Sequence, residues 1–105
     1  MTHIPDTITH ASAHPEPMPL EPCPPGKNER AWELAQIALR AKRLAAAIEE
    51  VERLCEARFN MEAGSSRAAI TTAHAKCARA KEERDRCRAN FEYALWHSAY
   101  GRVAR

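Results

Sequence analysis

The chain of 105 residues carries a net charge of +2, and all seven of its prolines lie at or before Pro25. A length this short allows one domain at most and a limited hydrophobic core. No run approaches the roughly 18 consecutive apolar residues that a membrane span requires, and no basic start followed by an apolar segment indicates a secretion signal. We therefore expect a soluble, cytoplasmic protein with reduced cysteines.

The first predicted segment, residues 1–28, is a proline-rich tail. Its prolines recur among short polar residues, and this composition favours polyproline II or a disordered chain over a helix. The tail has a net charge of −2. The sequence leaves open whether this extended tail lies against the rest of the protein.

The second predicted segment, residues 29–105, has the alanine-rich and charge-rich composition of long helices. Asn28 is well placed to cap a first helix, which we predict over residues 29–62. Gly64 lacks a Cβ and is expected to adopt the left-handed conformation in a turn at residues 63–66. A serine in this turn can then cap a second helix over residues 66–100.

Apolar residues recur at alternating spacings of three and four in both predicted helices, which places them on one stripe of each helix. The stripes contain Leu34, Ile37, Ala41, Leu44, Ile48, Val51 and Cys55 in the first helix and Ile70, Ala73, Cys77, Ala80, Arg84, Cys87, Phe91 and Ala94 in the second. When the chain is folded back at Gly64, large residues mostly face small ones, and Val51 faces Cys77. This agreement predicts an all-α fold, an antiparallel, coiled-coil-like two-helix hairpin. Its remaining apolar surface is expected to pack in a four-helix bundle or on a partner protein.

Two groups of residues are candidates for binding another protein. One group gathers at the open end of the hairpin and the other precedes the turn. Together they are Trp32, Leu39, Leu54, Phe59, Met61, Tyr93, Leu95, Trp96 and Tyr100. Aromatic side chains carry much of the binding energy at protein interfaces. The alternative is that the aromatic residues pack on one another and on the tail as a local end-cap.

The positive charge belongs to the second half of the chain, because residues 63–105 have a net charge of +5 and residues 29–62 a net charge of −1. The candidate contacts to the phosphates of a nucleic acid are Arg79, Lys81, Arg86 and Arg88. Helical spacing spreads these cations around the helix, and acidic residues lie among them, so a solvated, salt-bridged face is the preferred interpretation. Arg84 lies within the apolar stripe and is expected to reach out to Glu83 or to another chain.

Patterns for catalysis are missing from the sequence. It contains no glycine-rich phosphate loop and no Gly-x-Ser-x-Gly or His-Glu-x-x-His motif, and a rod of two helices offers no cleft for a substrate. His74 and Cys77 lie three residues apart, but a zinc site usually needs four ligands. We therefore expect no enzymatic activity, cofactor, metal or small-molecule substrate.

These features favour a small protein-binding module, such as a stoichiometric inhibitor or adaptor encoded by a bacterial virus. Its partner would be another protein or, in a homodimer, a second copy of the chain. A dimeric nucleic-acid-binding regulator that uses the basic second helix is one alternative, and a structural subunit of a homo-oligomer is another. Function belongs to sites rather than to folds, so the surfaces of the hairpin must decide among these classes.

Overall fold

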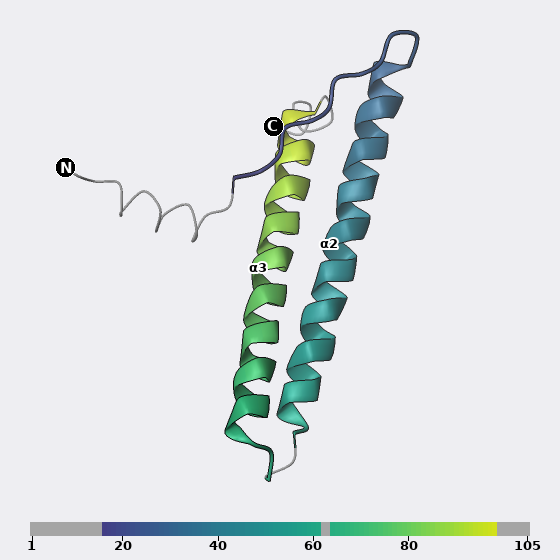
Figure 1. The fold of residues 1–105 in the computed structure, drawn as a ribbon. Helices are drawn as coiled ribbons and strands as arrows, with labels where there is room; N and C mark the ends of the chain where they lie inside the picture. The colour runs from purple at the N-terminus through teal and green to yellow at the C-terminus, as the bar shows by residue number, and fades with distance from the viewer. Residues whose placement is uncertain (1–15, 62–63, 99–105) are drawn as a thin grey trace, which may run out of the picture.

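The computed structural model describes residues 16–61 and 64–98, which contain two long helices. Helix α2 runs over Glu29–Phe59 and helix α3 over Arg67–His97, each 31 residues long. The helices lie side by side and antiparallel (Figure 1), and each is about 46 Å long at 1.5 Å per residue. The described part of the chain is all-α, and the predicted helical hairpin is confirmed.

Both helices begin at side-chain caps of the predicted kind. The Oδ1 atom of Asn28 accepts a hydrogen bond from the amide of Ala31 at 2.9 Å. The Oγ atom of Ser66 accepts one from the amide of Ala69 at 3.1 Å. Each bond satisfies a first-turn amide that has no partner within the helix. Local chemistry therefore sets the start of both helices.

The end of α2 differs from the prediction, because the helix stops at residue 59 rather than at residue 62. The amide of Asn60 donates to the carbonyl oxygens of Glu56 and Arg58, so the last turn closes on itself without a left-handed residue. Gly64 is not the C′ residue of α2, because the helix is capped at Asn60. Gly26, just before α2, has a positive φ of 81°.

The end of α3 involves a buried polar residue. The helix ends at His97, and Ser98 is fully buried, with its Oγ atom donating to the carbonyl oxygen of Leu95 at 3.0 Å. This bond satisfies one of the last helical carbonyls. The helix therefore ends before the predicted boundary at residue 100, because Ser98 already has extended backbone angles.

A tight turn directs the tail into α2. The amide of Lys27 donates to the carbonyl oxygen of Pro24 at 3.2 Å, and Pro25 and Gly26 occupy the two central positions. Proline followed by a residue of positive φ is the signature of a type II turn. The glycine at this position is therefore required by the backbone.

The two glycines give a matched pair of substitutions with opposite expected effects. Gly26→Ala is expected to destabilise the protein by about 1 kcal/mol, because a Cβ is unfavourable at positive φ. Gly64→Ala is expected to be neutral or stabilising by about 0.5 kcal/mol. Its Cβ would meet nothing within 4 Å, and alanine reduces the entropy of the unfolded chain. Thermal denaturation followed by circular dichroism measures both, and a greater loss at Gly64 would contradict the turn assignment.

The apolar core is a single stripe along the helix pair. The buried apolar residues are Ile37, Val51, Cys77, Ala80 and Ala94, and all of them occupy positions of the predicted stripes. Val51 and Cys77, which the predicted register places opposite each other, are both buried. Small residues in α3 let the two helices approach closely.

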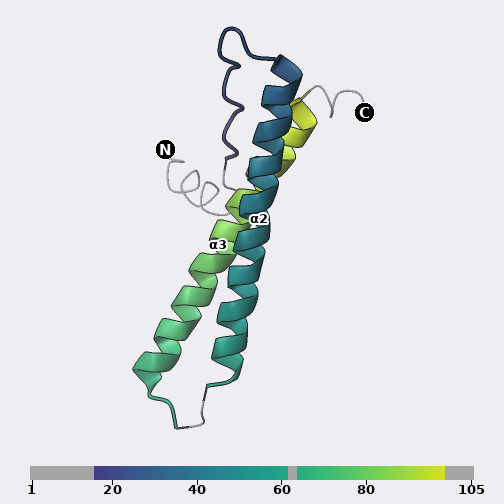
Figure 2. The same cartoon turned by 90° about the vertical axis from the view of Figure 1, so that its right-hand side faces the viewer.

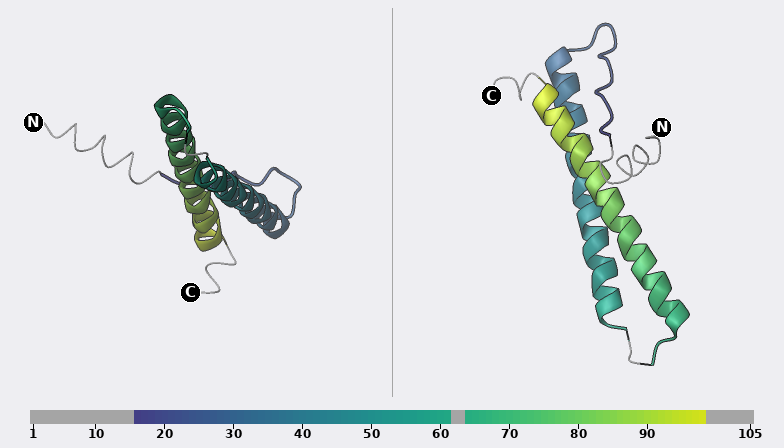
Figure 3. Two further views of the ribbon diagram at one scale, coloured as in Figure 1. Left: turned by 90° about the horizontal axis from the view of Figure 1, so that it is seen from below. Right: turned by 90° about the vertical axis from the view of Figure 1, so that its left-hand side faces the viewer.

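The helices cross at an inclined angle rather than running parallel, and they lie apart at the turn end (Figures 2 and 3). Leu34 near the open end and Ile70 near the turn belong to the stripes, yet they are 50% and 39% exposed. Two inclined helices cover each other best where they cross. The ends of both stripes therefore keep part of their apolar surface in solvent.

Arg84 lies half-buried at the helix contact and reaches a different carboxylate from the predicted one. Its Nε and Nη2 atoms both lie 3.1 Å from Oδ1 of Asp85. The predicted partner, Glu83, instead pairs with Arg86. The aliphatic part of the arginine can cover the stripe while the guanidinium stays at the surface.

Candidate protein-binding surfaces

At the open end of the hairpin, where α2 begins and α3 ends, Arg40 pins the tail to both helices. Its Nη1 atom donates to the carbonyl oxygen of Met18 at 2.8 Å and its Nη2 atom to that of Pro19 at 2.9 Å. The same Nη1 donates to the carbonyl oxygen of Asn90 in α3 at 2.8 Å. Burial lowers the pKa of Arg40 from its ordinary value, but an arginine keeps its proton at physiological pH. One charged group therefore joins three segments.

Further side chains complete the attachment of the tail. Asn90 accepts the amide of Met18 through Oδ1 at 2.8 Å. Gln36 accepts the amide of Glu21 at 2.8 Å and donates to its carbonyl oxygen at 3.2 Å. Trp32 donates to the same oxygen through Nε1 at 3.0 Å. A proline-rich extended chain has no internal hydrogen-bond ladder, and these side chains bind its free backbone groups.

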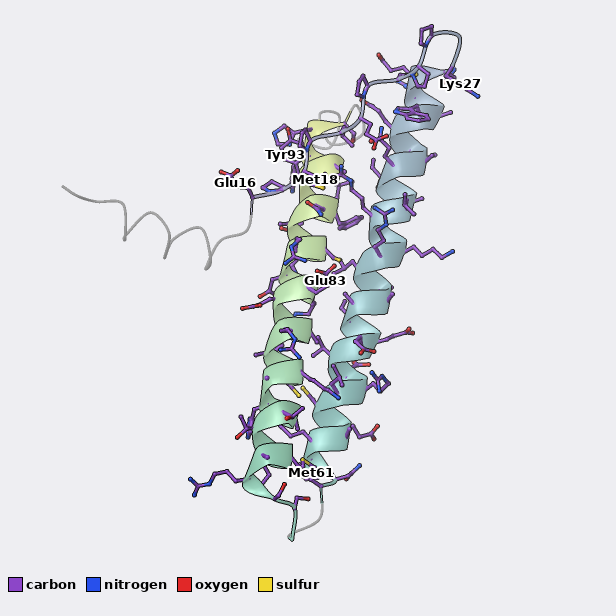
Figure 4. All side chains as sticks on the ribbon, in the orientation of Figure 1. Glu16, Met18, Lys27, Met61, Glu83 and Tyr93 are labelled. Atoms are coloured by element: carbon purple, nitrogen blue, oxygen red, sulfur yellow. The ribbon has the colours of Figure 1, made fainter. Side chains whose placement is uncertain are left out.

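A small hollow of about 170 Å³ lies between the tail and the two helices. Met18, Leu39 and Arg43 are among the residues that line it. Met18 is 64% exposed and Leu39 is 46% exposed, although the tail passes over this end of the hairpin (Figure 4). Residues 18–21 thus cover the open end only in part.

The structure divides the other open-end candidates into two groups. Trp32 and Tyr93 are half-buried, the first bound to the tail and the second stacked on a histidine ring with centroids 4.0 Å apart. Leu95 and Trp96 remain exposed. The end-cap interpretation thus accounts for Trp32, whereas Leu95 and Trp96 still offer surface to a partner. Tyr100 lies outside the described residues.

A groove opens between the helices at the turn end. The part nearest the turn has a volume of about 500 Å³, and a second part of about 450 Å³ continues towards the middle of the hairpin. The two parts share Arg53, Leu54 and Lys76, so they form one continuous depression, named here the turn-end groove. Its apolar lining consists of Leu54, Ala57, Met61, Ala68, Ala69, Ala73 and Ala80. Both parts are open to solvent, so the depression is a shallow groove rather than an enclosed pocket.

The three candidates before the turn do not share one surface. Leu54 and Met61 are half-buried and line the turn-end groove. Phe59, the last residue of α2, is 88% exposed and is not part of the groove lining. Burying such a ring is worth about 2 kcal/mol, so Phe59 is a separate candidate contact at the same end.

The rim of the turn-end groove is positively charged. The cations in its lining are Arg53, Arg58, Lys76 and Arg79, and its one carboxylate is Glu50. Glu50 already binds Arg53, and this hydrogen bond lowers the pKa of Glu50 and raises that of Arg53. Lys76 and Arg79 have no ion-pair partner among residues 16–61 and 64–98. The groove therefore combines an apolar floor with an excess of cations.

The four candidate nucleic-acid contacts are dispersed. Arg86 pairs with Glu83, and Arg88 lies 3.7 Å from a carboxylate oxygen of Asp85. Arg79 lines the turn-end groove, whereas Lys81 lies two residues later and about 200° around the helix. Local ion pairs and helical rotation therefore weaken this run as a phosphate-binding surface.

The tail attachment and the turn-end groove lie on the same face of the hairpin. On α2 the residues of this face follow one another at spacings of three and four, namely Gln36, Arg40, Arg43, Ala47, Glu50, Leu54 and Ala57, and Met61 continues the lining just after the helix. Residues with this spacing lie on one side of a helix. Residues 18–21 of the tail cover part of the open-end half of this face. Within the described residues, the turn-end half has no such cover.

Sequence reasoning did not identify Gln36, Arg40 and Asn90 as functional. A signal existed, because Trp32, Gln36 and Arg40 are spaced four apart and form one column of hydrogen-bond donors on α2. Such a column beside a proline-rich segment matches the free carbonyl groups of an extended chain. The partner from α3 is 72 residues from Met18 along the chain, too far for any local pattern.

Within residues 16–61 and 64–98, no helix is both long enough and apolar enough to cross a lipid bilayer. The same residues contain no group of three or more histidine, cysteine or acidic side chains arranged to hold a metal ion. Comparison of the chain with protein-family models, with curated proteins and with solved structures found no match.

Proposed function

We propose that this chain is a small, non-enzymatic protein-binding module that acts as a stoichiometric inhibitor or an adaptor. The supporting observation is the apolar surface that the hairpin leaves uncovered. Seven large apolar side chains of the two helices are more than a third exposed: Leu34, Leu39, Ile48, Phe59, Ile70, Leu95 and Trp96. Large apolar side chains that a two-helix hairpin leaves in solvent are candidates for burial against a partner.

The hairpin is built to present this surface in a defined shape. Side-chain caps at Asn28 and Ser66 hold the helix starts, and Arg40 fastens the tail to both helices. A binding surface that is ordered before association loses less conformational entropy on binding. Two preformed helices can add to a groove or bundle of a partner and so block it or connect it to another protein.

The same exposed residues also support the second candidate, a structural homo-oligomer, because a second copy could cover them. The nucleic-acid alternative receives less support, since Arg86 and Arg88 are already paired with carboxylates. Sedimentation of the pure protein distinguishes the protein-binding module from the homo-oligomer. A steep loss of nucleic-acid binding with added salt would identify the nucleic-acid-binding regulator.

Affinity capture from the native host with the full-length chain tests the proposal. We expect one protein at stoichiometric yield, with recovery reduced about tenfold or more by Phe59→Ser at the turn end or by Trp96→Ser at the open end. Lys42→Ser, at an exposed position outside both surfaces, is the matched control and should not change recovery. Circular dichroism verifies that all variants stay helical. If Phe59→Ser and Trp96→Ser both still capture every protein that the native chain captures, the proposal is rejected.

A further inference from the structure

We infer that the turn-end groove binds an acidic amphipathic helix of about three turns. This inference rests on the proposed function and names the chemical class of the partner segment. It depends on three properties of the groove, namely its length, its alanine-rich floor and the charge of its rim.

The length of the groove limits the bound segment. Its lining comes from residues 50–61, which include the end of α2 and the two residues after it, and from residues 68–80 of α3. The stretch of α3 spans about 18 Å at 1.5 Å per residue. Towards the turn, the hairpin ends. Towards the open end, the same face is occupied by residues 18–21 of the tail, which Gln36 and Arg40 hold in place. A straight partner helix much longer than the groove would therefore meet the tail.

The floor of the groove suits the close approach of a helix. Ala57 from α2 and Ala69 and Ala73 from α3 carry short side chains, while Leu54 and Met61 offer larger apolar contacts on the α2 side. A helix that lies in such a groove inserts apolar residues at positions i, i+3 or i+4, and i+7. The partner segment therefore needs one apolar stripe.

The rim determines the charge of the residues beside that stripe. Arg58 stands on the α2 side, and Lys76 and Arg79 stand on the α3 side. The carboxylate of Glu50 is already engaged by Arg53. Both edges of the groove therefore present cations, and acidic residues on both flanks of the partner helix complement them.

The same charges argue against a second copy as the occupant. A two-fold dimer through the groove would place each rim against an identical rim, so that Lys76 and Arg79 would face cations. Nucleic acid fits less well for a different reason. Phosphates require cations but gain nothing from the apolar floor around Leu54 and Ala73.

The test uses a synthetic helical peptide of about 14 residues with leucines in one stripe and glutamates on both flanks. The matched control peptide carries lysines in place of the glutamates. Both are titrated calorimetrically into the full-length chain. We expect one-to-one binding of the acidic peptide, with the lysine peptide weaker by about tenfold or more. Leu54→Asn should also weaken binding of the acidic peptide, because the floor loses an apolar contact.

A pair of charge-reversal variants gives the decisive control. Lys76→Glu with Arg79→Glu should weaken binding of the acidic peptide about tenfold or more. Arg30→Glu with Lys42→Glu changes the net charge equally at exposed positions outside the groove, and it should alter affinity by less than about twofold. Equal effects of the two double variants, or equal binding of the two peptides, would overturn the inference.

Two further measurements identify other occupants. A dimer in sedimentation that dissociates on Leu54→Asn would assign the groove to a second copy and overturn the inference. An oligonucleotide that binds the groove more tightly than the acidic peptide would also overturn it.

Host capture separates this inference from the proposed function. One outcome is that the Lys76→Glu, Arg79→Glu variant still captures the host protein while Trp96→Ser does not. In that case the protein-binding function stands and the groove inference fails. If the acidic peptide binds as expected and no host protein is captured, the groove chemistry stands and the proposed function fails.

Discussion

Replacing Ile37 with alanine is expected to lower the free energy of unfolding by about 3 kcal/mol, because the substitution removes buried methyl groups and leaves a cavity. Ile37 is only 9% exposed and is one of five buried apolar residues in the described chain. Small domains have little stability in reserve, so a loss of this size should unfold a measurable fraction of the molecules. Urea denaturation followed by circular dichroism measures the effect.

Leu39→Ala is the matched control for this substitution. It removes the same number of carbon atoms two residues along α2, but from a side chain that is 46% exposed. We expect a loss below about 1 kcal/mol. Equal losses at Ile37 and Leu39 would show that the helices do not meet along the predicted stripe.

Replacing Arg40 with methionine is expected to release the tail and to destabilise the protein by about 2 kcal/mol. Methionine keeps most of the aliphatic stem but donates no hydrogen bond to Met18, Pro19 or Asn90. The backbone amides of Met18 and Glu21 should then lose protection against hydrogen exchange, because their bonds to Asn90 and Gln36 depend on the position of the tail. Hydrogen exchange at these two amides is the direct measurement.

Arg43→Met provides the control for tail release. Arg43 lines the same hollow and carries the same charge, but it has no hydrogen bond to residues 16–28 of the tail. Protection at Met18 and Glu21 should therefore remain. Unchanged protection in Arg40→Met would mean that Gln36 and Trp32 hold the tail without the guanidinium.

Tail release has a consequence for binding as well. Residues 18–21 lie on the open-end half of the face that continues into the turn-end groove. Removing them would extend the uncovered surface along α2 towards Gln36. We therefore expect Arg40→Met to accept longer amphipathic helices than the native chain, and the tail to limit the length of partner that the hairpin binds.

Much of the fold could be predicted from the sequence, because the relevant interactions are local or periodic. Asn28 and Ser66 cap amides three residues away, so their role is visible in a few letters of sequence. The spacing of Ile37, Val51 and Cys77 identifies the sides of the helices that meet, because helical geometry repeats regularly. The candidate surface residues Leu54 and Met61 were identified by the same periodicity.

The sequence by itself thus determined two capped helices, the stripe along which they pack and the antiparallel arrangement. Only the tertiary structure decided that Arg40 joins the tail to both helices, that inclined packing opens the turn-end groove, and that Lys76 and Arg79 stand on its rim without carboxylate partners among the described residues. The physical reason is the distance along the chain over which each interaction acts. Caps and periodicity act over a few residues, whereas the bond between Met18 and Asn90 spans 72 positions. The crossing of two helices depends on how all the side chains of a stripe pack together.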